Sequence, residues 1–106
     1  MARALEAEPR RVAVVAAGGL SHAPGERIHG DIDTEFDEEF IRRLIANDVD
    51  AFTSYSDEEI ERRGLGTHEI RAWVAVAGVA EDRQARALFY EPVVAWATGC
   101  GLLYYE

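Results

Sequence analysis

The chain has 106 residues, of which 48% are hydrophobic, which is typical of one folded unit, and we assign residues 1–106 to a single domain. Twenty acidic residues against eleven basic ones give a formal net charge of -9. This charge repels nucleic-acid phosphates and anionic membrane surfaces, so we expect neither a nucleic-acid nor a membrane partner. The single cysteine, Cys100, excludes an internal disulfide, and no signal peptide or membrane-length apolar run is visible, which predicts a cytoplasmic protein.

The first third of the chain predicts a helix, a strand and a loop. Residues 2–8 have high helix propensity and stop before Pro9. Residues 11–17 are a short apolar run without polar alternation, which is typical of a strand covered on both faces in a parallel or mixed sheet. Residues 20–34 are rich in Gly, His, Pro and Asp and have no periodicity, so we expect an ordered loop.

Three helices are predicted next. A helix over about 35–46 carries acidic residues in its first turn, where the helix dipole favours them. Its apolar stripe consists of Phe36, Phe40, Ile41, Leu44 and Ile45. Ser56 and Glu59 have the spacing of a capping box, which opens a second, short helix closed by Gly64. Thr67 is positioned to cap a third helix that runs to about Val79.

Residues 87–105 are rich in aromatic and β-branched side chains and predict two short strands or one bent strand. The fold class is therefore α/β, a mixed sheet flanked by helices. A strand over 11–17 that is covered on both faces needs sheet neighbours that this chain barely supplies, so we expect another chain to complete the sheet. We interpret Trp73 and Trp96 as packing residues.

His22 is the first candidate for chemistry because it follows Gly18-Gly19 at the carboxyl end of the predicted strand, where open α/β sheets bind ligands. The glycines let the backbone approach a ligand closely. A histidine at this place can act as a general base or as a metal ligand. The alternative is a loop histidine that only bonds a backbone carbonyl, and local chemistry alone favours it.

An acidic run, Asp31, Asp33, Glu35 and Asp37, follows the loop. It lacks the Gly and terminal Glu positions of an EF-hand calcium loop. Capping of the helix that follows explains it better.

Four blocks of the sequence resemble one known family in the right order and spacing. They are Arg11–His22, Gly30–Asp37 with Phe40 and Leu44 beyond it, the Gly-x-x-x-x-Glu-x-x-x-Trp block Gly64–Trp73, and Tyr90–Gly99. Together they resemble the C-terminal part of the class III extradiol ring-cleavage dioxygenases, of the protocatechuate 4,5-dioxygenase beta-subunit type. The resemblance implies the C-terminal portion of that fold.

The resemblance also implies an oxidoreductase that opens the ring of a catecholic, in some cases carboxylated, aromatic compound with O2. Enzymes of this family use Fe(II) held by two histidines and one carboxylate. By this resemblance Glu69 is the iron ligand, and His22 is the acid/base that takes a proton from a catechol hydroxyl. Gly19, Ser21 and Arg27 are candidates for substrate binding, Arg27 through a substrate carboxylate.

Both histidine ligands of the family lie in the N-terminal part of the complete subunit, which has no counterpart in this sequence. The remaining histidines are His29 and His68. His68 is adjacent to Glu69, so on a helix it points about 100° away from it. A metal site built from His22, His29 and Glu69 would be a new arrangement.

Three hypotheses remain open. In the first, a second polypeptide supplies the missing strands and both histidine ligands, and the pair forms an extradiol dioxygenase. In the second, the chain is a truncated, non-catalytic module of the same fold that self-associates as a homo-oligomer or serves as an interaction subunit. In the third, the chain acts alone in a metal-independent reaction with His22 as the base.

Overall fold

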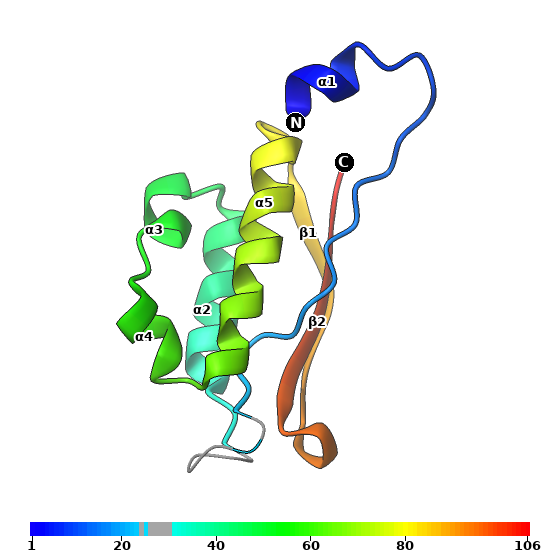
Figure 1. Cartoon of the computed structure of the whole chain (residues 1–106). Helices are drawn as coiled ribbons and strands as arrows, with labels where there is room; N and C mark the ends of the chain where they lie inside the picture. Colours follow the sequence, from blue (N-terminus) through cyan, green and yellow to red (C-terminus); the bar gives the residue numbers. More distant parts are fainter. Residues whose placement is uncertain (24, 26–30) are drawn as a thin grey trace.

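The structure is a computed structural model that describes residues 1–23, 25 and 31–106 (Figure 1). Its elements are α1 (Ala2–Glu6), α2 (Thr34–Ile45), α3 (Val49–Thr53), α4 (Asp57–Glu61), the 3₁₀-helix η1 (Leu65–Glu69), α5 (Ile70–Ala80), β1 (Ala85–Val93), the 3₁₀-helix η2 (Val94–Trp96) and β2 (Thr98–Tyr105). Helix α2 contacts α3 on one side and strand β1 on the other, as Figure 1 shows. None of the described helices is long and apolar enough to cross a membrane.

Helix α2 confirms the helix predicted over 35–46. Its N-cap is Asp33, whose carboxylate accepts a hydrogen bond from the Phe36 N–H at 2.9 Å. The apolar stripe faces inward, and Phe40, which is fully buried, lies edge-on to Trp73 of α5 with 6.4 Å between ring centroids. This contact joins α2 to α5 and confirms Trp73 as a packing residue. The core therefore lies between these two helices and the hairpin.

The capping box predicted at Ser56 and Glu59 is confirmed, with both of its hydrogen bonds present, at 3.1 and 2.8 Å. The prediction that Thr67 caps the third helix was wrong. Residues 65–69 form η1, and α5 begins only at Ile70. The hydroxyl of Thr67 donates instead to the Arg63 carbonyl at 2.8 Å, so this side chain bonds to the turn that follows α4. Helix α3 was not predicted.

Strands β1 and β2 form an antiparallel hairpin, which confirms the first of the two alternatives for the tail. The connection contains η2 and Ala97, which has a φ of 50°, so the chain reverses through a left-handed residue. Trp96 lies in this connection and is 71% exposed, so the interpretation of Trp96 as a packing residue was wrong. The described residues leave the Trp96 side chain on this reversal largely uncovered.

The strand predicted over residues 11–17 is absent from the described structure, where this segment is irregular. Beyond this segment, Leu20 N–H donates to the Gly99 carbonyl at 2.9 Å and Gly99 N–H donates to the Ser21 carbonyl at 3.0 Å. Val15 is 83% exposed. A strand needs a hydrogen-bonding neighbour along its length, and no other described residues supply one to this segment.

Candidate active site

Two blocks that lie far apart in the sequence meet around the loop of residues 18–22. Trp73 of α5 donates its indole N–H to the Gly18 carbonyl at 3.0 Å. The Gly19 N–H donates to the Glu69 carboxylate at 2.5 Å. The backbone N–H of His22 donates to the Thr67 hydroxyl at 3.2 Å. The loop is therefore hydrogen-bonded to the corner between η1 and α5 at Gly18, Gly19 and His22.

The His22 ring has a defined proton arrangement. Its Nδ1 lies 2.7 Å from the Leu20 carbonyl oxygen, and a carbonyl oxygen can only accept, so Nδ1 carries the proton. In the neutral ring Nε2 then holds the lone pair and is the atom that can take up a proton. Nε2 lies 3.7 Å from Oε2 of Glu69. The His22 side chain is 13% exposed and that of Glu69 51%, so a basic nitrogen and a carboxylate meet where the interior opens to the surface.

Two glycines of the second block make room for His22. A Cβ on Gly66 would lie 2.3 Å from Cδ2 and Nε2 of the His22 ring. Gly64 has a φ of 102°, and a Cβ there would lie 2.2 Å from the His22 carbonyl oxygen. The ring and the backbone of His22 therefore occupy space that any larger residue at these positions would take. The sequence showed the glycines but not that they border this histidine.

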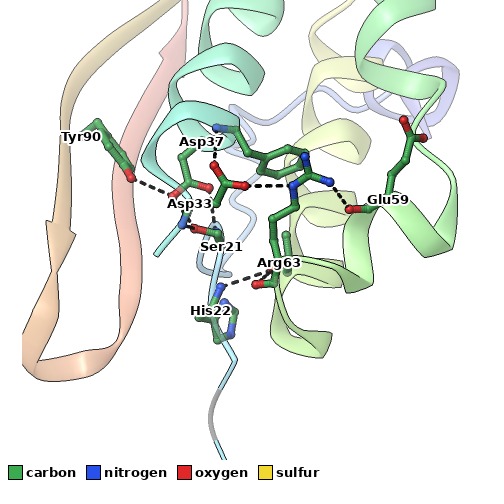
Figure 2. Close-up of polar contacts among 9 residues, drawn as sticks. Ser21, His22, Asp33, Asp37, Glu59, Arg63 and Tyr90 are labelled. Atoms are coloured by element: carbon green, nitrogen blue, oxygen red, sulfur yellow. Dashed lines mark hydrogen bonds and ion pairs between the residues drawn. The ribbon is translucent and has the colours of Figure 1, made fainter. Parts of the chain in front are cut away.

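A buried carboxylate lies beside Ser21 of the loop, as Figure 2 shows. Asp37 of α2 is fully buried and accepts three hydrogen bonds: from the Ser21 N–H at 2.8 Å, from the Ser21 hydroxyl at 2.8 Å and from the Tyr90 hydroxyl at 2.7 Å. Burial raises the pKa of Asp37, and the bonds from Tyr90 and Ser21 oppose that rise. Burial and the neighbouring Asp37 raise the pKa of Tyr90, so its hydroxyl remains a donor to the carboxylate.

The interpretation of the acidic run as helix-capping residues is confirmed for Asp33; Asp37 lies in the first turn of α2, as expected, but its carboxylate does not cap the helix. Asp33 caps α2, and its second oxygen accepts from Arg63 at 3.2 Å. Asp37 turns toward the loop instead. A signal for this was present, because Asp37 has helical spacing to the buried positions Phe40, Ile41 and Leu44, and a polar residue in an apolar stripe is a candidate for a buried hydrogen-bonding role.

Among the other described candidates, Gly19 bonds to Glu69, whereas His68 and Ser21 bond to other groups. His68 contacts Glu61 at 3.0 Å and Arg71 at 3.4 Å. The hydroxyl of Ser21, which was expected near a substrate, is fully buried and bonds to protein groups. Arg27 and His29 lie outside the described residues. Across residues 1–23, 25 and 31–106 no group of three or more His, Cys, Asp and Glu residues could hold a metal ion.

Residues 1–101 match the family described as the catalytic LigB subunit of aromatic ring-opening dioxygenase. The chain belongs to this LigB family. The resemblance predicted from the four sequence blocks is thereby confirmed at the level of the family, and so is the α/β fold class that combines helices with a sheet.

Several curated relatives of this chain are named 2,3-dihydroxyphenylpropionate/2,3-dihydroxicinnamic acid 1,2-dioxygenase. The protein of Xanthobacter autotrophicus is 36% identical over 77 residues, which are 68% of this chain and 25% of the relative. That of Photorhabdus laumondii is 28% identical over 102 residues, 92% of this chain and 32% of the relative. That of Azotobacter vinelandii is 33% identical over 102 residues, which are 92% of this chain and 33% of the relative.

The chain therefore spans only about a quarter to a third of the length of these relatives. No solved structure is significantly similar to it.

Proposed function

We propose that the chain forms part of a non-heme Fe(II) extradiol dioxygenase that opens the ring of a catecholic compound, one with a carboxylated side chain, with O2. Membership of the ring-opening dioxygenase family supports this proposal. The relatives are named for dihydroxyphenyl compounds that carry an acid group, which supports the substrate class. The observation that carries the proposal is the basic Nε2 of His22 facing the Glu69 carboxylate across 3.7 Å at the surface.

Glu69 is proposed as the iron ligand. A half-exposed carboxylate fits the carboxylate position of a site with two histidines and one carboxylate, and the described residues offer no complete group of three ligands around it. We propose that another polypeptide supplies the two histidines. When bound, the Fe(II) would bring the catechol and O2 into contact and permit electrons to pass between them.

His22 is proposed as the acid/base residue. Leu20 holds Nδ1–H, so Nε2 accepts the proton of a catechol hydroxyl and can later return it. The Gly19 N–H bond to Glu69 keeps the carboxylate beside the loop, so the proton acceptor and the metal ligand stay at a fixed separation. Gly66 leaves open the space that the ring occupies. Together these contacts orient one base and one ligand toward the same opening.

Exposed apolar side chains support a second polypeptide. Val12 is 52% exposed, Val15 83% and Leu102 47%, although such residues are usually buried. The 12–18 segment and the end of β2 line the same groove, with α5 along its side. A partner that brings strands would cover these side chains and pair the backbone of 11–17.

Co-expression with a polypeptide that carries the remaining family segment tests the proposal. We expect iron in the purified pair and O2 uptake with 2,3-dihydroxyphenylpropionate. Glu69→Gln should lose iron, whereas His22→Gln should keep iron and lose turnover by about a hundredfold or more. His68→Gln is the matched control, because it removes a histidine that contacts Glu61 and Arg71, and it should change neither. Full activity of the isolated chain contradicts the need for a partner, and iron retained in Glu69→Gln contradicts the ligand.

The same exposed apolar side chains favour a second candidate function, a non-catalytic module that self-associates through this face. Size measurement combined with elemental analysis separates the two. A homo-oligomer that holds no iron, with or without the co-expressed polypeptide, supports the module, and an iron-loaded assembly with ring-opening activity contradicts it.

A further inference from the structure

A single peptide group connects Asp37 to His22. The Ser21 N–H and the Leu20 C=O belong to the same planar peptide unit. Its N–H donates to Oδ1 of Asp37 at 2.8 Å, and its C=O accepts the Nδ1–H of His22 at 2.7 Å. The result is a continuous chain from carboxylate through peptide to imidazole, which ends at the Nε2 that faces Glu69.

We propose that Asp37 is a positioning residue for His22, which fixes through the Leu20–Ser21 peptide both the orientation of the ring and the nitrogen that carries its proton. This inference rests on the proposed function in one respect only, namely that Nε2 accepts the proton of a catechol hydroxyl. All the residues that make up the arrangement lie in this chain.

The contacts of Asp37 are those of a fixed anchor. Its second oxygen, Oδ2, accepts the hydroxyls of Ser21 and Tyr90, at 2.8 and 2.7 Å. Ser21 in turn accepts the N–H of Asp33 at 2.9 Å, so the start of α2 holds the loop from the other side. A Cβ on Gly99 would lie 2.0 Å from Oδ2, so β2 closes the space around the carboxylate. The loop, α2 and both strands of the hairpin therefore hold one group.

The electrostatics favour the same conclusion. A hydrogen bond to an ionised carboxylate is stronger than one to a neutral acceptor, and hydrogen bonds in a chain polarise one another. When the Ser21 N–H binds the Asp37 carboxylate, the Leu20 carbonyl at the other end of the peptide becomes a better acceptor. It then holds the Nδ1–H of His22 more firmly, which leaves the lone pair on Nε2. Asp37 therefore affects the ring without touching it.

The test is the tautomer of His22, read from the imidazole ¹⁵N resonances of the whole 106-residue chain at about pH 8, above the ordinary titration range of imidazole. His22→Gln identifies the signals. We expect the proton on Nδ1 in the native chain. In Asp37→Asn, whose side chain still accepts from Ser21 N–H but carries no charge, we expect the ratio of the Nδ1–H to the Nε2–H form to fall by about tenfold.

Glu38→Gln is the matched control, because it removes a carboxylate from the neighbouring, exposed position of α2 and should leave the ratio unchanged. A native ring that carries its proton on Nε2 overturns the proposal, whatever the variants do. So does a folded Asp37→Asn with the native ratio, or an equal shift in Glu38→Gln. Should Asp37→Asn fail to fold, Tyr90→Phe, which removes one of the hydrogen bonds that anchor the Asp37 carboxylate, must change the ratio, and an unchanged ratio overturns the proposal.

The measurement needs no iron, partner or substrate, so its failure is distinct from failure of the proposed function. The native tautomer with no ring opening under any condition would leave the positioning role intact and refute the dioxygenase. Ring opening by a native chain whose His22 ring carries its proton on either nitrogen equally would support the dioxygenase and refute the positioning role.

Discussion

Replacing Gly66 by Ala tests whether the glycine exists to accommodate the His22 ring. The new Cβ would lie 2.3 Å from Cδ2 and Nε2 of the ring, and an ordinary contact begins at 3.4 Å, so the ring must move by about 1.1 Å. That movement strains the rotamer, at about 0.5–1.5 kcal/mol, and breaks the 2.7 Å bond to Leu20, at about 0.5–1.5 kcal/mol. Ala in a helical backbone returns about 0.5–1 kcal/mol.

Gly78→Ala is the matched control, because Gly78 lies in α5 and a Cβ there meets nothing within 4 Å. Gly78→Ala should raise the free energy of unfolding by about 0.5–1 kcal/mol, because it strains no rotamer and breaks no hydrogen bond. Urea titrations should therefore place Gly66→Ala about 1–3 kcal/mol below Gly78→Ala in free energy of unfolding. The His22 ring resonances should shift only in Gly66→Ala. Two variants of equal stability with unchanged His22 resonances would refute the assignment of Gly66 to the ring.

Three further outcomes follow from the core, the caps and the buried carboxylate. Phe40→Ala should lower the free energy of unfolding by about 3–5 kcal/mol, since the ring is fully buried against Trp73; a loss under about 1 kcal/mol in urea titrations contradicts this packing. Ser56→Ala should cost about 1 kcal/mol through the lost cap, whereas no change in thermal unfolding would show that the cap contributes nothing. Burial raises the pKa of Asp37 above its ordinary value of 3.8. At a pH between the two values, the Asp37 carboxyl therefore binds a proton in the folded chain that it has released in the unfolded chain. The free energy of unfolding, native minus Asp37→Asn, should therefore fall as pH rises from about 4 through the raised pKa, and urea titrations that show it rising refute the sign.

Much of the helical part of the fold could be predicted because its signals are local. The stripe around Phe40 and the capping box at Ser56 each specify an element within one or two turns, and both are confirmed. The strand over 11–17 could not be judged in the same way. Its sequence satisfies the pattern of a buried strand, but a strand also needs neighbours, and the described residues of this chain do not provide them.

The candidate site shows the same division. His22 and Glu69 were predicted from a resemblance, and the structure brings them within 3.7 Å of each other, although their roles stay predictions. The surroundings of His22 were missed because they depend on tertiary contacts. Thr67 was interpreted as a cap and Asp37 as a helix-terminus charge, and both instead hold the backbone of the loop. Each has a residue type that suits either role, and only the fold decides between them.

These contacts of the loop matter for an active site whose residues come from two polypeptides. The carbonyl that holds the His22 ring belongs to a peptide fixed by Asp37, and the backbone of His22 is fixed by Thr67, so contacts within this chain orient the His22 ring. Glu69 is held beside the loop by Gly19. Under the proposed function a partner therefore needs to bring two histidines to a base and a carboxylate that are already in place. Preorganisation of this kind lowers the cost of assembling a catalytic geometry, because the groups on one side have no freedom left to lose. If the His22 ring and the Glu69 side chain were instead mobile in the isolated chain, as rapid averaging of their resonances would reveal, the partner would have to order both sides, and this advantage would be absent.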